Sequence, residues 1–231
     1  MTINEIKEEI KSLSGNNADF YNKLNPTGKP SLGVRLPDLR NIAKRIARED
    51  YEWFLQNNPM DTFEEETLEA FVIGYAKDDI QKILGYLKDF IPKVHDWSVN
   101  DSLCSTFKIA RKYPEETLSA LEPFYTSHRE FEVRVVAIML MCHFLRDEYV
   151  DRVIEIWNRL DLSTGYYARM GVAWAIATLA AKYPQKCFDY MTGDNNLDEW
   201  TFNKTLQKMK ESYRVDNELV ERIQKRLINK N

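Results

Sequence analysis

The feature of this chain that most constrains its fold is an internal repeat of about 35 residues. The segment Ala110-Arg-Lys-Tyr-Pro114 recurs 70 residues later as Ala180-Ala-Lys-Tyr-Pro184, and Tyr149 lies midway between the two. Arg134, in an apolar segment, is matched 35 residues on by Arg169. Each repeat is long enough for two helices, which must stack on their neighbours to bury their apolar faces. The repeat therefore predicts a helical solenoid with a concave face.

Hydrophobic periodicity along the chain supports this interpretation. Apolar residues recur at intervals of three and four, as in Ile3, Ile6 and Ile10, and no segment alternates convincingly with period two. The stretch 16–33, rich in proline and glycine, is expected to be a loop. Helices are expected at 2–13, 37–48, 51–57, 62–76, 79–90, 98–112, 115–125, 131–144, 147–159, 166–182, 185–191, 198–212 and 216–229. We therefore predict an all-α fold, a single-domain α-solenoid of HEAT-like repeats over residues 1–231.

Composition excludes several classes of protein. The 231 residues contain only 8 glycines and 8 prolines, few for an all-β fold, and no apolar run approaches the roughly 20 residues of a membrane span. The first ten residues are acidic and amphipathic, unlike a signal peptide. Three cysteines form no CxxC pair and three histidines lie far apart, so we expect reduced thiols in a cytoplasmic protein that uses no metal and no cofactor.

Charge is distributed unevenly along the chain. The net formal charge is −4, but residues 23–48 carry a net +6, residues 49–100 a net −8 and residues 201–231 a net +4. Two basic ends can form one phosphate-binding surface, and two separate solvated helix faces are the alternative. A nucleic-acid-binding role requires the acid-rich middle to lie mostly on the convex side.

A small set of residues looks unsuited to a purely apolar core. Trp97 and Asp101 lie four residues apart and share one helix face, Arg134 interrupts an apolar run, and Trp174 lies among small residues. Indole faces attract cations, a carboxylate stabilises positive charge developing on a sugar, and arginine binds phosphate. A cationic base on a deoxyribose would engage all of these groups. Such a base leaves without a strong general acid, since it is already positive.

Each of these residues also has a structural interpretation. Trp97 and Trp174 can be core residues, and Asp101 can be an exposed or capping carboxylate. Arg134 can form an ion pair within its repeat with Glu130 or Glu132. Residue chemistry alone leaves both sets of interpretations open.

At these residues the chain resembles the DNA alkylation repair family of HEAT-like DNA glycosylases, the AlkD type. The resemblance runs from about Phe20 to Tyr213 and is carried by short segments in order. These are Gly33-Val-Arg-Leu-Pro-Asp-Leu-Arg40, Phe71-Val-Ile-Gly-Tyr75, Trp97-Ser-Val-Asn-Asp-Ser102, Phe131-Glu-Val-Arg134, Gly171-Val-Ala-Trp-Ala175 and Asn203-Lys-Thr-Leu-Gln-Lys208. The resemblance implies hydrolysis of the N-glycosidic bond of positively charged alkylated purines, such as 3-methyladenine and 7-methylguanine, in double-stranded DNA. It further implies a monomer that acts without base flipping.

The resemblance also implies roles for individual residues. Asp101 would stabilise the oxocarbenium-like sugar and position water, Trp97 and Trp174 would cradle the deoxyribose, and Arg134 would hold a backbone phosphate. Tyr21 would line the cleft and Arg35 would contact DNA. We expect a monofunctional enzyme, because these residues include no Schiff-base nucleophile and Lys108 is expected to face solvent. An inactive DNA-structure-binding relative and a protein-binding helical scaffold are the alternatives.

Overall fold

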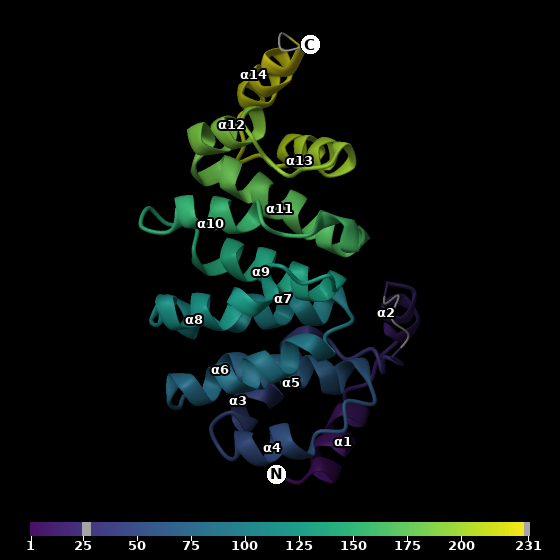
Figure 1. Ribbon diagram of the computed structural model, residues 1–231. Helices are drawn as coiled ribbons and strands as arrows, with labels where there is room; N and C mark the ends of the chain where they lie inside the picture. The colour runs from purple at the N-terminus through teal and green to yellow at the C-terminus, as the bar shows by residue number, and fades with distance from the viewer. Residues whose placement is uncertain (25–28, 229–231) are drawn as a thin grey trace. The chain divides into compact units, whose positions relative to one another are not determined.

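The computed structural model describes residues 1–24 and 29–228, and the regular secondary structure of these residues is entirely helical (Figure 1). The α-helices of these residues are α1 (Ile3–Ser12), α2 (Ala18–Leu24), α3 (Leu36–Ile46), α4 (Tyr51–Asn57), α5 (Phe63–Tyr75), α6 (Ile80–Phe90), α7 (Trp97–Thr106), α8 (Pro114–Leu121), α9 (Glu130–His143), α10 (Val150–Trp157), α11 (Tyr166–Lys182), α12 (Pro184–Thr192), α13 (Glu199–Glu211) and α14 (Asn217–Ile228). Short 3-10 turns are η1 (Ile91–Lys93), η2 (Lys108–Arg111), η3 (Glu122–Phe124) and η4 (Leu162–Thr164). The predicted all-α, solenoid-like class is confirmed.

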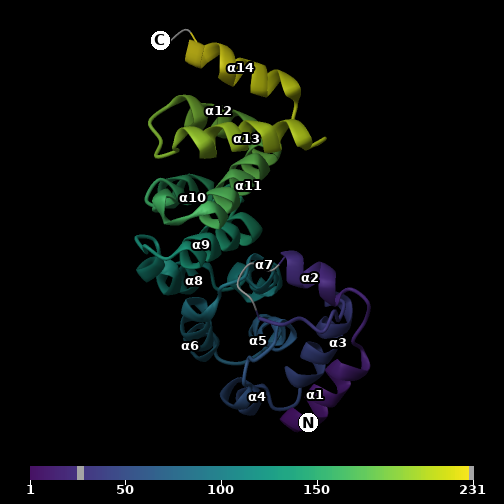
Figure 2. The same ribbon diagram turned by 90° about the vertical axis from the view of Figure 1, so that its right-hand side faces the viewer.

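The chain divides into two compact units, residues 1–120 and residues 121–231. Within the first unit α5 packs on both α3 and α7, and within the second α11 packs on both α9 and α13. Each unit thus stacks three long helices in chain order (Figure 2). The single domain and the concave face stay predictions. No helix among the described residues is long and apolar enough to cross a bilayer.

The repeated sequence segments mark the same structural position. Pro114 and Pro184 are the first residues of α8 and α12, and Val150, directly after Tyr149, is the first residue of α10. Proline suits the start of a helix because its missing N–H would have no intrahelical acceptor there. The second helix of each predicted repeat therefore begins where the repeat places it.

Buried glutamates hold the extended segment before α3 against α5. Glu64 is fully buried, and its carboxylate accepts hydrogen bonds from the hydroxyl of Ser31 at 2.8 Å and the amide of Leu32 at 3.0 Å. Lys29 donates to Glu66 at 2.6 Å. Five of the twelve acids in 49–100 are buried, namely Glu64, Glu65, Glu66, Glu69 and Asp96. The other seven acids of this stretch are not buried, and its placement mostly on the convex side stays a prediction.

The two largest differences from the sequence prediction lie at α2 and at the end of α7. The supposed loop 16–33 contains α2, and the helix predicted over 98–112 ends at Thr106. Phe107, at φ −73° and ψ 57°, leaves the helical region, and a 3-10 turn follows. Residues 25–28, and residue 229 of the last predicted helix, lie outside the described residues.

Candidate active site

In the first unit, a buried carboxylate fixes where α7 begins. Asp96 is 1% exposed, and it accepts hydrogen bonds from the amides of Ser98 at 2.6 Å and Val99 at 3.2 Å. This is an N-cap, which satisfies amides that have no partner inside the helix. The cap makes Trp97 the first helical residue and places Asp101 one turn later on the same face.

Trp97 connects α7 to α2. Its indole Nε1 donates a hydrogen bond to the carbonyl of Leu24, the last residue of α2, at 3.3 Å. The Trp97 side chain is half-buried, so part of it stays accessible. The interpretation of Trp97 as a fully buried core residue therefore does not fit.

Asp101 is partly exposed, and its neighbour on the chain orients it. The side-chain amide of Asn100 donates to Asp101 Oδ1 at 3.1 Å. Asn100 itself is fully buried, and its own Oδ1 has no hydrogen-bond partner among the residues that the structure describes. Asparagine is a weak helix former, and burying its unbonded oxygen lowers the stability of the folded chain. This cost indicates that Asn100 is kept for another role. Sequence analysis missed Asn100 as a positioning residue, although an asparagine beside the candidate aspartate was a visible signal.

Two further predicted residues lie elsewhere in this unit. The ring of Tyr21, on α2, stacks on Phe63 at a centroid distance of 5.7 Å, which anchors α2 to the start of α5. Arg35 precedes α3, and its exposed guanidinium pairs with Asp38 at 3.0 Å. Exposed ion pairs of this kind contribute little to stability, so Arg35 is free to exchange Asp38 for a phosphate at small cost.

In the second unit, Arg134 lies between α9 and α11. It is 4% exposed, and its Nη1 donates to the carbonyl of Tyr167 at 2.8 Å. Gly171 provides the space for it, since a Cβ at that position would lie 3.2 Å from Arg134 Cγ and 3.3 Å from Nη1. The guanidinium is thus held in place by α11.

The two glutamates considered as partners of Arg134 each bind a group at the end of a helix. Glu130 accepts a hydrogen bond from the amide of Tyr167 and so caps the start of α11. Glu132 pairs with Arg129 at 2.8 Å and accepts from the hydroxyl of Ser127 at 2.6 Å. Glu130 and Glu132 thus shape the ends of α9 and α11.

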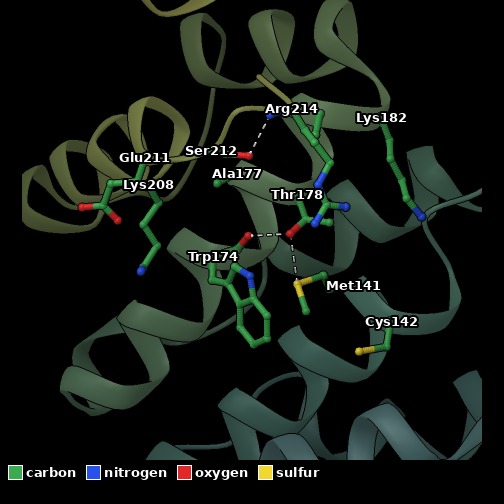
Figure 3. Close-up of a pocket in the computed structure, with 11 residues that line it drawn as sticks. Met141, Cys142, Trp174, Ala177, Thr178, Lys182, Lys208, Glu211, Ser212 and Arg214 are labelled. Carbon is green, nitrogen blue, oxygen red and sulfur yellow. Dashed lines mark hydrogen bonds between the residues drawn. The ribbon is translucent and has the colours of Figure 1, made fainter. Parts of the chain in front are cut away.

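Trp174 lies three residues after Gly171 on α11, so it follows the Arg134 contact by one turn. Its side chain is 40% exposed and lines a cavity of about 450 Å³ between α9, α11 and α13. Figure 3 shows the indole beside Met141 and the Arg214 guanidinium reaching toward Thr178. The Thr178 hydroxyl donates to the Trp174 carbonyl at 3.0 Å. This tryptophan faces solvent-accessible space rather than a packed core.

The rim of this cavity is basic. Lys182, Lys208 and Arg214 line it together with a single acid, Glu211 (Figure 3). Among the residues that the structure describes, none of the three cations forms an ion pair. An aromatic ring beside uncompensated positive charge suits an aromatic anion such as a nucleotide.

The family model for "DNA alkylation repair enzyme" matches residues 6–209 of this sequence. The chain belongs to the DNA alkylation repair enzyme family. No protein in the curated set matches the sequence. As a member of this family the chain is an enzyme of DNA alkylation repair, and DNA is its partner.

Several residues have roles in this repair enzyme that were not predicted from the sequence. Asn100 orients the candidate carboxylate, Gly171 makes room for Arg134, and Glu130 caps α11. Lys208 and Arg214 were visible in the sequence as part of the basic stretch 201–231, whereas their proximity to Lys182 was not, because Lys182 ends α11 and Lys208 lies in α13.

Proposed function

We propose that this family member is a monofunctional DNA glycosylase. Its substrates are positively charged alkylated purines, such as 3-methyladenine and 7-methylguanine, in duplex DNA, and it acts without flipping the base. We also propose that it acts as a cytoplasmic monomer. Asp101 carries the chemistry, with Trp97, Trp174 and Arg134 around the lesion and its phosphate, and with Tyr21 and Arg35 as further DNA contacts.

The observation that carries the proposal is the arrangement of Trp97 and Asp101 on α7. A partly exposed carboxylate, held by Asn100, lies one helical turn from a partly exposed indole in a chain of the DNA alkylation repair family. A carboxylate stabilises an oxocarbenium ion, and an indole face stabilises a cation.

The reaction is a hydrolysis in which the bond between C1′ and the purine nitrogen breaks. The bonding electron pair leaves with the base, which thereby loses its positive charge and departs as a neutral molecule. Positive charge develops on the sugar, where the Asp101 carboxylate stabilises it and orients a water molecule. The water oxygen bonds to C1′ and releases one proton, so the products are a free purine and an abasic site.

Arg134 and Trp174 would act on the strand that carries the lesion. Trp174 offers a ring face, and Lys182, Lys208 and Arg214 offer positive charge beside it. Arg134 exposes only a small edge, so a phosphate contact there would use that edge while Tyr167 holds the rest of the guanidinium. A preorganised cation of this kind loses little conformational entropy on binding.

The test compares a cationic lesion with a neutral one in the same duplex. The purified chain is incubated with a duplex containing a single 7-methylguanine and with a matched duplex containing a single hypoxanthine, and the free base is measured by chromatography. We expect release of 7-methylguanine above the spontaneous rate and no release of hypoxanthine. Release of neither base, with DNA still bound, would instead support the inactive DNA-binding alternative.

Whether the enzyme is monofunctional has a separate readout. A Schiff-base intermediate becomes a permanent covalent adduct when borohydride is present. We expect no protein–DNA adduct during base release, because the proposed reaction uses water as the nucleophile. An adduct would contradict the proposed mechanism and would require a nucleophilic amine.

A further inference from the structure

The first unit contains a second cavity, of about 560 Å³, at the C-terminal ends of α5 and α7. Its walls include the rings of Tyr75 and Tyr113 and the apolar side chain of Ile109. Figure 2 shows α5 and α7 side by side, and they pack extensively. The volume is in the range of pockets that hold small ligands.

Hydrogen bonds from α3 tie together two residues that line this cavity. Arg40, on α3, donates to the hydroxyl of Tyr75 at 3.1 Å and to the hydroxyl of Thr106 at 2.9 Å, which links three successive helices. The guanidinium also lies 4.2 Å from the centre of the Phe71 ring. A Cβ at Gly74 would lie 2.6 Å from Thr106 Cγ2, so α5 and α7 could not approach this closely with any other residue there.

The rim of the cavity is strongly basic. Lys77, Lys108 and Lys112 line it, and the ammonium of Lys44 lies 5.5 Å from the centre of the Tyr75 ring beside it. The ammonium of Lys112 lies 5.0 Å from the centre of the Tyr113 ring. Within residues 1–24 and 29–228, none of these four lysines forms an ion pair.

Asp78 is the one carboxylate among the described residues that line the cavity, and its hydrogen bonds go to groups other than these four lysines. Asp78 accepts hydrogen bonds from the hydroxyl of Tyr51 at 2.6 Å, from Lys82 at 3.1 Å and from the amide of Asp79 at 2.7 Å. The hydrogen bond from Tyr51, with those from Asp79 and Lys82, lowers the pKa of Asp78 to about 2. Asp78 is thus ionised, and its carboxylate oxygens already accept hydrogen bonds from Tyr51, Asp79 and Lys82.

We propose that this cavity is a nucleotide subsite for a DNA strand, with a phosphodiester on Lys108 and Lys112 and the sugar and base against Tyr75 and Tyr113. Uncompensated ammonium groups bind phosphates, and aromatic rings stack on bases of any sequence. The inference rests on the proposed function in so far as DNA is the ligand.

The subsite lies at a fixed separation from the candidate catalytic residues. Thr106 lies nine positions after Trp97 on α7, and at a rise of about 1.5 Å per residue the two are about 14 Å apart along the helix axis. One strand of DNA advances about 3.4 Å per nucleotide, so the separation corresponds to about four nucleotides. The cavity would therefore hold DNA about four nucleotides from the lesion.

The experiment measures binding of an undamaged 24-base-pair duplex by fluorescence anisotropy at several salt concentrations. The test variant is Lys108→Gln/Lys112→Gln, and the control variant, Lys11→Gln/Lys88→Gln, removes the same charge from exposed positions of α1 and α6. We expect about a tenfold loss of affinity at about 0.1 M salt for the test variant, with a salt slope lower by about 2. The control variant should bind as the wild type does.

A second variant and a free nucleotide complete the test. Tyr113→Leu should weaken binding severalfold while Tyr113→Phe preserves it, because stacking needs the ring and not the hydroxyl. Unchanged affinity and slope for the lysine variant would overturn the subsite. So would tight binding of deoxyadenosine monophosphate with no lysine effect on duplex binding, which would assign the cavity to free nucleotides.

The glycosylase proposal and the subsite proposal are contradicted by different results. A wild-type chain that releases 7-methylguanine while the lysine variant binds DNA unchanged keeps the glycosylase proposal and loses the subsite. A wild-type chain that binds DNA in a Lys108- and Lys112-dependent way and releases no base keeps the subsite and loses the glycosylase proposal. Lysines that only stabilise helix ends would lower the melting temperature without altering the salt slope.

Discussion

The side chain of Arg134 occupies the space beside the backbone of Gly171, where an added Cβ would lie 3.2 Å from Arg134 Cγ. Gly171 is in the middle of α11, where glycine costs about 1 kcal/mol relative to alanine. Gly171 therefore lowers the stability of α11 but leaves space for the side chain of Arg134.

Alanine substitutions at three helical glycines test this relationship. Gly85→Ala meets nothing within 4 Å and should stabilise the chain by about 0.5–1 kcal/mol. Gly171→Ala should gain less, because Arg134 must move, and it should lower base release. Gly74→Ala should destabilise by about 1–3 kcal/mol, because its Cβ would lie 2.6 Å from Thr106. Urea denaturation gives the order, and a Gly171 variant as stable and as active as the Gly85 variant would contradict it.

The hydrogen bond from Trp97 to Leu24 predicts how α2 is held. Trp97→Phe keeps an aromatic ring but removes the donor, so we expect a loss of about 0.5–1.5 kcal/mol. Amide hydrogen exchange should accelerate locally in α2. Exchange in α2 that is identical in variant and wild type would mean that the stacking of Tyr21 on Phe63 holds this helix without Trp97.

Trp174 is predicted to discriminate by the charge of the lesion. Its face is expected to stabilise a cation by about 0.5–2 kcal/mol, so Trp174→Leu should slow release of 7-methylguanine by about two- to thirtyfold. Binding of undamaged duplex should change much less. Single-turnover kinetics separate the two effects, and an equal loss in rate and in undamaged-duplex binding would assign Trp174 to general DNA contact.

Glu69 is predicted to make stability depend on pH. Burial raises its pKa above the ordinary 4.5, outweighing the opposing effects of the hydrogen bond from Asn58 and of Lys93. A carboxyl whose pKa is raised on folding contributes most below its unfolded pKa, and this contribution is lost as pH rises through the folded pKa.

Glu69→Gln mimics the protonated form, so it should be more stable than wild type at pH 7. The difference should shrink as pH falls toward 4.5 and below. Urea denaturation between pH 4 and pH 8 measures it, provided that both proteins unfold in one cooperative step. A variant that is less stable than wild type at pH 7, with a deficit that shrinks as pH falls, would show that the ionised form of Glu69 is the stabilising one.

Helices with strong periodicity could be predicted closely from the sequence. The stretch 166–182 was predicted without error as α11, because apolar residues continue to the Tyr-Pro pair that starts the next helix. By contrast, α2 was missed because prolines and glycines on its C-terminal side dominate the local signal. The end of α7 was missed because only the backbone of Phe107 reveals it.

The candidate site could be predicted as a set of residues but not as contacts. Trp97 and Asp101 share a face by spacing alone, whereas the bond from Trp97 to Leu24 joins residues 73 positions apart. The burial of Glu64 also depends on a distant segment, since its partners include Ser31. The four glutamates of α5 look like a solvated face until their partners elsewhere in the same chain are known.

The most direct measurement is base release from a methylated duplex by wild type, Asp101→Asn and Asp89→Asn. Asp89 is an exposed aspartate on α6 and serves as the matched control. We expect wild type and the Asp89 variant to release 7-methylguanine, and we expect Asp101→Asn to bind the duplex but release no base above the spontaneous rate. Equal release by all three proteins would contradict the central role given to Asp101.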